Sequence, residues 1–213
     1  MRCLWQEGSR CFWDRAMWVV KLGGSLHDDA PALRRWLRSL VEAPDPPRVL
    51  VPGGGPFADA VRRLQPAMGF GDLAAHRMAI LAMQQFGLAL QALEPRLALA
   101  ETEAELHTGP ASVWLPWRLA GRDATIAASW DVTSDSLACW LAARLGAAAL
   151  LLVKSGPVPT GEATAEALAA TGLVDAAFPA LARRFAGSIR VLPRDREFPG
   201  PLGAKPGGCR VAR

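Results

Sequence analysis

Residues 19–25 read Val19-Val20-Lys21-Leu22-Gly23-Gly24-Ser25, a short apolar run that leads through a lysine into two glycines. The β-branched valines predict a buried strand. Because the glycines lack Cβ atoms, the backbone after this strand can turn tightly and present its N–H groups. Such a turn can bind anionic oxygen atoms, and the ammonium group of Lys21 would add a full positive charge. The alternative is an ordinary strand and turn that carry a solvated lysine.

Lysine is scarce in this chain. Of 24 Lys plus Arg residues, only Lys21, Lys154 and Lys205 are lysines. Arginine supplies the other positive charges, so a lysine beside a glycine turn is less expected by chance. Its compact charge on a flexible stem suits contact with a moving phosphoryl group.

The composition indicates a globular protein. Its 213 residues are 51% hydrophobic and 21% charged, enough for one sizeable domain. The net charge of +4 comes without a basic stripe interleaved with aromatic residues, so we expect no nucleic-acid partner. No apolar run is long enough to span a membrane. The cysteines fit no zinc or redox spacing, and we expect reduced thiols in a cytoplasmic protein: Cys3, Cys11, Cys139 and Cys209.

The first sixteen residues carry charges and no signal-peptide core. We expect 1–16 to be a disordered extension, or Met17 to be the natural start. Residues 17–213 are then expected to form a single domain.

A second glycine-rich turn follows the next predicted strand, Arg48–Val51. It reads Pro52-Gly53-Gly54-Gly55-Pro56 and leads into a helix that contains Phe57. Two strand-turn-helix units in succession predict a parallel sheet whose ligands bind at the carboxyl ends of the strands. The spacing Gly53-x-Gly55-x-x-Ala58 also matches a dinucleotide fingerprint loosely, which leaves a dinucleotide-dependent oxidoreductase as an alternative.

The longest helical pattern covers residues 71–94. It has more apolar positions than one exposed helix needs, so we expect burial on more than one side, in the core or against a second subunit. A homodimer or a larger homo-oligomer would follow. His76 lies near the start of this helix, where a satisfied structural histidine is favoured over a ligand contact.

A third candidate region runs from Ser129 to Gly156. Thr133 or Ser134 is a good N-cap for a predicted helix, and an acid such as Asp135 in a first turn is ordinary. A fully apolar strand, 148–153, then delivers Lys154-Ser155-Gly156 at its end. The remaining chain predicts helices over 162–170 and 174–186 and strands over 188–192 and 209–211.

Three motifs in this order resemble the amino acid kinase (carbamate kinase-like) superfamily, over residues 17–192. They are 19–25, the stretch Val51-Pro52-Gly53-Gly54-Gly55-Pro56-Phe57-Ala58-Asp59, and the stretch Val132-Thr133-Ser134-Asp135-Ser136-Leu137-Ala138. The strings 75–83 and 131–135 are most similar to a short branch, which includes the archaeal kinase of (aminomethyl)furanmethanol phosphate and related proteins of methylotrophic bacteria.

This resemblance implies an α/β fold, a three-layer αβα sandwich with a mainly parallel central sheet. It implies an acceptor-binding and phosphate lobe over 17–146 and a nucleotide-binding lobe over 147–213. It also implies transfer of the γ-phosphoryl group of ATP, with Mg²⁺ bridging the phosphates, to a small anionic acceptor. For the short branch, that acceptor is (aminomethyl)furanmethanol phosphate, which becomes a diphosphate in methanofuran-type C1-carrier biosynthesis.

The family's roles fall on residues of the three motifs. Lys21 resembles the lysine on the transferred phosphoryl group, and Asp135 the carboxylate that orients it. The positions that would bind ATP or its phosphates are Lys21, Gly23, Gly24, Ser25, Lys154, Ser155 and Gly156. The positions that would bind the acceptor are Gly53, Gly54, Gly55, Phe57, Thr133 and Ser134. No residue is assigned as a metal ligand.

One departure from the family pattern leaves alternatives open. Many members carry a second catalytic lysine after a downstream Gly-Met pattern, which this sequence lacks. Either Lys154 or Lys205 supplies the missing charge, or the protein is a weak kinase or a non-catalytic nucleotide or oxyanion binder. A kinase of another acceptor, of the uridylate or amino-acid type, is a further alternative.

Overall fold

The computed structural model describes residues 17–43, 46–198 and 208–212. Its first half comprises β1 (Trp18–Leu22), the 3-10 helix η2 (Gly24–Asp28), α1 (Ala30–Glu42), β2 (Arg48–Pro52), α2 (Gly55–Met68), α3 (Asp72–Leu93), β3 (Ala98–Ala100), α4 (Glu103–Leu106), β4 (Ala111–Trp114) and α5 (Trp117–Ala120). Its second half comprises α6 (Ser134–Arg144), β5 (Ala149–Lys154), β6 (Gly161–Thr164), α7 (Ala165–Ala170), α8 (Phe178–Ala182), β7 (Ser188–Pro193) and β8 (Cys209–Ala212). The extension 1–16, Lys205, Cys3 and Cys11 lie outside the described residues.

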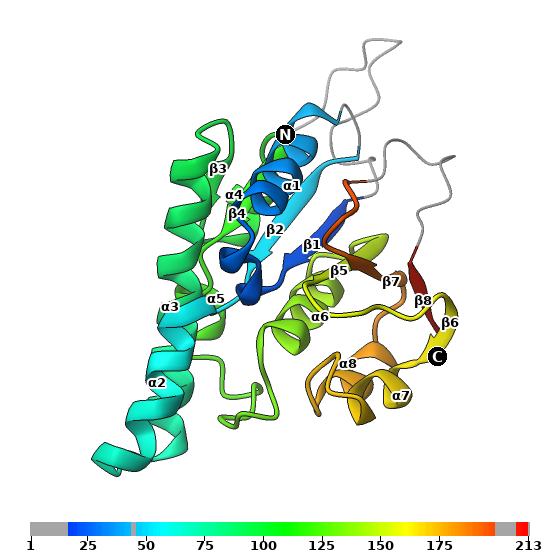
Figure 1. Ribbon diagram of the computed structural model, residues 1–213. Coiled ribbons are helices and arrows are strands. Elements are labelled where there is room, and N and C mark those ends of the chain that lie inside the picture. The colour runs from blue at the N-terminus through cyan, green and yellow to red at the C-terminus, as the bar shows by residue number, and fades with distance from the viewer. Residues whose placement is uncertain (1–16, 44–45, 199–207, 213) are drawn as a thin grey trace, which may run out of the picture.

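The strands form one eight-stranded sheet in the order β3-β4-β2-β1-β5-β7-β8-β6 (Figure 1). The neighbours from β3 to β7 are parallel, whereas β8 is antiparallel to β7 and carries β6 alongside it. The mainly parallel sheet predicted from the two strand-turn-helix units is therefore confirmed, with β1 and β5 at its centre.

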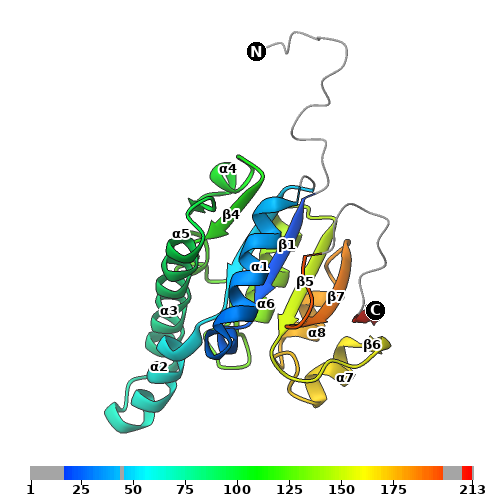
Figure 2. The same cartoon turned by 45° about the horizontal axis from the view of Figure 1, so that its top comes forward.

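Helices cover both faces of the sheet, which completes the three layers (Figure 2). On one face, Trp36 and Leu40 of α1 pack with Val20 and Leu22 of β1. On the other face, Leu137 of α6 packs in the cluster that contains alternate residues of the central strands. Because successive strand residues point to opposite faces, Lys21 points toward the α6 side.

The long hairpin of α2 and α3 runs along the β4 side of the molecule, and its tip projects beyond the sheet (Figure 1). Gly69 ends α2 with a positive φ of 74°. Ile80 and Phe86 of α3 are buried, but Leu81 and Leu88 are 38% and 47% exposed. The apolar surplus seen in the sequence thus lies partly on the outside of the chain. No helix of the described residues is long and apolar enough to cross a bilayer.

Two local predictions were wrong, and the predicted N-cap of α6 is confirmed in position but not in its hydrogen bond. Residues 162–164 form strand β6 rather than helix, because they hydrogen-bond with β8, a partner far away in sequence. The helix predicted over 174–186 is shorter, because only α8 is helical there. The Asp175 carboxylate accepts a hydrogen bond from the backbone N–H of Phe178, the first residue of α8. Thr133 occupies the N-cap of α6 but makes no side-chain cap; its hydroxyl donates to Asp175 instead.

Candidate active site

Lys21 and Lys154 meet because their strands are neighbours. In the parallel pairing of β1 with β5, Lys21 lies opposite Leu152. Lys154 follows two residues later, so it points to the same face of the sheet as Lys21. Both side chains are largely buried, with 6% and 12% of their surface exposed. The sheet thus brings two of the three lysines to the carboxyl ends of its central strands, under α6.

Asp135 joins the two lysines. It lies in the first turn of α6, and its carboxylate is 2.9 Å from Lys21 Nζ and 2.6 Å from Lys154 Nζ. Asp135 is therefore more than a first-turn acid, since it is the counter-ion of two buried cations. The cluster retains one net positive charge when all three groups are ionised, which suits it to contact with anionic oxygen atoms.

The electrostatics of this cluster are coupled. Burial, and after it the charge of Lys21, lower the pKa of Lys154 to about 8, although Asp135 opposes both effects. Burial alone would raise the pKa of Asp135, but the two lysines outweigh it and hold this pKa below its usual value. Asp135 therefore stays ionised at neutral pH, and Lys154 is near its titration point.

The two glycine turns pack backbone against backbone beside the lysines. A Cβ atom on Gly53 would lie 2.2 Å from the nitrogen of Gly24, and one on Gly24 would lie 2.3 Å from the nitrogen of Gly55. Only glycine permits this approach. The turn after β1 also contacts the end of β5, where Gly23 N–H donates to the carbonyl of Val153. The glycines predicted to bind phosphate and acceptor therefore lie together.

Serine side chains link the loops after β1 and β5. The hydroxyl oxygens of Ser25 and Ser155 are 2.5 Å apart. Of the predicted phosphate-binding residues, Ser25 thus contacts Ser155, and Lys21 and Lys154 share Asp135. Nothing lies within 4 Å of a Cβ built on Gly156, so this position faces open space.

A pocket of about 80 Å³ opens between the α2–α3 hairpin and the start of α6. It is lined by Gly54, Ala58, Arg62, His76, Ala79, Ile80, Met83, Trp130, Val132, Thr133, Ser134 and Leu137. Gly54 and Ser134 connect the pocket to the glycine turns and to Asp135. Three predicted acceptor residues, Gly54, Thr133 and Ser134, line this pocket. Phe57 does not, and it is 41% exposed on α2.

The wall of this pocket contains two residues that sequence reasoning did not single out. The guanidinium carbon of Arg62 lies 4.4 Å from the centre of the Trp130 ring. The Trp130 indole N–H donates to Gln65, which in turn donates to Asp72. These contacts join the loop before α6 to the hairpin. No spacing in the sequence signals them, because the partners lie 65 positions apart.

Asp175 fixes the start of α6 and thereby Asp135. Its carboxylate accepts hydrogen bonds from the backbone N–H groups of Thr133 and Ser136, at 2.9 and 3.0 Å, and from both of their hydroxyls. It therefore serves as the cap that Thr133 was predicted to provide. A helix cap that comes from a distant segment leaves no local sequence signature.

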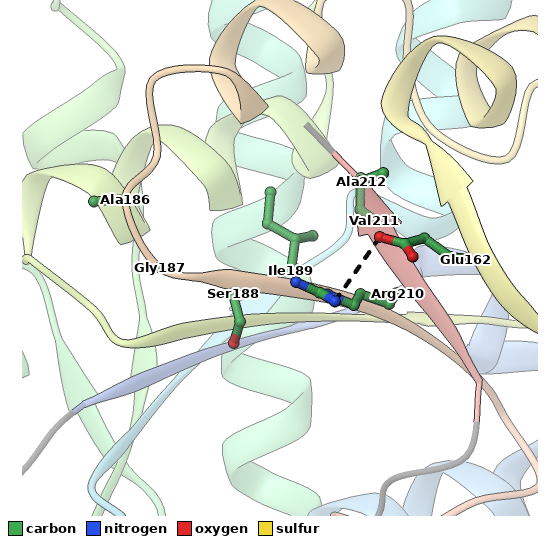
Figure 3. Close-up of a pocket in the computed structure, with 8 residues that line it drawn as sticks. All are labelled: Glu162, Ala186, Gly187, Ser188, Ile189, Arg210, Val211 and Ala212. Atoms are coloured by element: carbon green, nitrogen blue, oxygen red, sulfur yellow. Dashed lines mark ion pairs between the residues drawn. The ribbon is translucent and has the colours of Figure 1, made fainter.

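A larger cavity of about 450 Å³ lies elsewhere, between the start of β7 and the end of β8 (Figure 3). Ser188 and Val211 line it, and Arg210 faces Glu162 at 3.9 Å. Ser188 is the first residue of β7, whereas Lys154 is the last residue of the parallel strand β5. The cavity therefore lies at the amino-terminal end of these strands and Lys154 at their carboxyl end. It does not adjoin the lysine cluster.

Within the described residues, no group of three or more His, Cys, Asp or Glu side chains could hold a metal ion. Asp135, the carboxylate of the lysine cluster, is already occupied by two ammonium groups.

Comparison with known proteins agrees with this geometry. The chain matches the profile of the Amino acid kinase family over residues 16–157, well over half its length. It is 29% identical over 128 residues to [5-(aminomethyl)furan-3-yl]methyl phosphate kinase of Methanocaldococcus jannaschii. That alignment covers 59% of this chain and 59% of the archaeal protein. The archaeal kinase represents the short branch that the sequence strings resemble.

Solved structures share the fold at low identity. Uridylate kinase from Archaeoglobus fulgidus superposes with a TM-score of 0.68 at 15% identity, covering 92% of this chain and 99% of that one. Aspartate kinase from Synechocystis gives 0.67 at 16% identity, covering 92% of this chain and 39% of that one. The profile match and the common fold lead to one conclusion: the chain belongs to the amino acid kinase family.

Proposed function

We propose that this protein transfers the γ-phosphoryl group of ATP to the phosphate of a small phosphomonoester, giving ADP and a diphosphate. The observation that carries the proposal is the cluster in which Asp135 holds Lys21 and Lys154 beside two glycine turns. The proposed acceptor is the compound in the name of the archaeal relative, [5-(aminomethyl)furan-3-yl]methyl phosphate. Such a step would belong to methanofuran-type C1-carrier biosynthesis.

The charges of the cluster suit an acceptor that is already ionised. A phosphomonoester loses its second proton near pH 6, so its oxygen can attack without a general base. An oxygen of the acceptor phosphate would form a bond to the γ-phosphorus, while the bond from that phosphorus to the β-phosphate oxygen breaks and ADP leaves with the electron pair. Lys21 and Lys154 would stabilise the negative charge on the transferring group.

The neighbouring residues have roles that follow from their places. Gly23, Gly24 and Ser25 would present N–H and hydroxyl groups to the phosphates of ATP, together with Ser155 and Gly156. The turn Gly53–Gly55 would lie against the acceptor, which enters the pocket lined by Thr133 and Ser134. The nucleotide would extend over the 147–213 lobe. Magnesium, held by ATP phosphates and water, would neutralise part of their charge.

The position of Lys154 bears on the rival hypothesis, a binder that has lost catalysis. That hypothesis arises from the absent downstream lysine. Lys154 lies 2.6 Å from the carboxylate that also holds Lys21, and it offers a second cation at the same point. This contact favours a kinase. Lys205, the other candidate for that charge, lies outside the described residues. The loose fingerprint at Gly53-x-Gly55-x-x-Ala58 belongs to a kinase-family turn and does not favour an oxidoreductase.

An acceptor panel tests the proposed function. Purified protein with ATP and Mg²⁺ is assayed for ADP release with the furanmethyl phosphate, uridine monophosphate, acetylglutamate and aspartate. We expect ADP above a no-protein control only with phosphomonoesters, and fastest with the furan compound. ATP binding by calorimetry with no turnover on any acceptor would instead establish the binder.

A further inference from the structure

His76 is a buried polar side chain without a partner. It is 9% exposed, lines the pocket and makes no hydrogen bond or ion pair within the described residues. Burial, with a smaller effect of the neighbouring Arg77, lowers the pKa of His76 below its ordinary value. The imidazole is therefore neutral at pH 7 and offers one N–H donor and one lone pair. Its ring nitrogens are not fully enclosed, so a ligand in the pocket can reach them.

The position of His76 in the α2–α3 hairpin places it away from the lysine cluster. A Cβ on Gly55, in the glycine turn, would contact Phe86, so the start of α2 lies beside the later part of α3. His76 precedes Phe86 by ten positions, about 15 Å along a helix. It therefore lies toward the far end of the pocket and is not placed to touch a phosphoryl group held by Lys21. A group at that end contacts the part of the acceptor that does not react.

The pocket limits what that part can be. A volume of about 80 Å³ holds roughly five to eight water-sized positions, enough for one small ring with a short arm. The lining includes apolar groups of Ile80, Met83 and Leu137 but no carboxylate. A ring that bears an amine would find no counter-ion there. At the end of the pocket away from the Thr133 and Ser134 hydroxyls, the lone pair of His76 is the side-chain acceptor in the lining.

We propose that His76 is a specificity-determining residue, whose imidazole accepts a hydrogen bond from the amine on the ring of the acceptor. This inference rests on the proposed function and adds which end of the acceptor is recognised and by which side chain. Arg62, an exposed residue of the lining, stacks on the Trp130 ring.

A comparison of two acceptors tests this contact. One is [5-(aminomethyl)furan-3-yl]methyl phosphate, and the other carries a methyl group in place of the aminomethyl group. For the natural protein we expect kcat/KM to favour the amine roughly ten- to a hundred-fold, as for a hydrogen bond to a charged group. His76→Phe keeps the ring shape without the lone pair, so the preference should fall to about one, with KM for ATP unchanged.

Matched variants keep the test specific. His76→Gln retains an acceptor oxygen and should keep part of the preference. His107→Phe, at the end of α4, should keep all of it. Thermal melting checks that each variant folds, and His76→Leu replaces the phenylalanine variant should that one not fold.

The outcomes separate the two proposals. An unchanged amine preference in a folded His76→Phe or His76→Leu protein, with turnover intact, overturns the role of His76 alone. No turnover by the natural protein overturns the proposed function. In that case, binding is measured by calorimetry. The contact is upheld if the natural protein binds the aminomethyl compound and His76→Phe does not, and it is overturned as well if the natural protein binds neither the aminomethyl nor the methyl compound.

Discussion

At the scale of single residues, one carboxylate holds two lysines that would otherwise repel each other. Removing a counter-ion from buried charges is normally costly. Lys154 can relieve that cost by losing its proton, because burial has already lowered its pKa to about 8. The cluster is therefore able to lose its anion and remain folded, which makes its role in catalysis testable apart from its role in stability.

Asp135→Asn should leave the fold intact and reduce kcat by about 10²–10³, since the lysines lose both their positions and their counter-charge. Lys21→Arg should also be slow, because a planar guanidinium does not replace a compact ammonium in a tight glycine turn. In a double-mutant cycle on turnover, the second change should cost little once the first is made. Additive losses, or near-normal turnover of Asp135→Asn, would show that Asp135 is only a helix-start acid.

The pH dependence of turnover should identify Lys154. Its pKa is lowered from 10.5 to about 8, so it is charged below that pH and neutral above it. If its charge stabilises the transferring group, kcat/KM for ATP should fall as the pH rises through about 8, an apparent value that belongs to the coupled cluster. Lys154→Arg stays charged and should lose this alkaline fall. An identical profile in both proteins would rule out Lys154 as the titrating group.

At the scale of elements, α6 carries Asp135 and is held by Asp175. Five donors meet this one carboxylate, from Thr133, Ser136 and Phe178. Asp175→Ala would leave the first turn of α6 without its cap. We expect a loss of about 2–3 kcal/mol in the free energy of unfolding. Turnover should fall as well, because Asp135 is then less well placed.

Denaturant unfolding and initial rates measure both effects of Asp175→Ala. The matched control is Asp195→Ala, an exposed acid in the turn after β7, which should change neither quantity. Loss of stability without loss of turnover would mean that Asp175 holds α8 and not the candidate site.

Local sequence predicted the elements whose signals are local. The first two strands and the glycine turns after them appeared within a residue or two, because apolar runs and glycines nearby in the sequence determine them. Strand β6 was missed because its hydrogen bonds come from β8, nearly fifty positions later. In the same way, Lys21 and Asp135 were visible as motif residues. Their contact with Lys154 could not be predicted, because it depends on which strands become neighbours. The roles of Asp175 and Trp130 could not be predicted either, because both residues act through partners far away in the sequence.

At the scale of the whole molecule, an apolar strip remains on the outside of α3. Met78, Leu81 and Leu88 are 37%, 38% and 47% exposed, and Leu99 on the edge strand β3 is 40% exposed. A monomer rarely leaves such a surface uncovered. We expect a homodimer that buries this strip, so light scattering should give a mass near twice 22.7 kDa. Leu81→Glu with Leu88→Glu should return a folded monomer, while Leu64→Glu, on α2, should not.

Transfer of a phosphoryl group from one phosphate to another is the activity that unites the site and the fold. Phosphorus-31 NMR of one sample, containing protein, ATP, Mg²⁺ and [5-(aminomethyl)furan-3-yl]methyl phosphate, follows every phosphate at once. We expect a pair of coupled diphosphate signals, separate from those of ADP, that grows as ADP forms, and no such pair with Lys21→Met. ATP that stays intact, or ADP that appears only with free inorganic phosphate, would contradict this expectation.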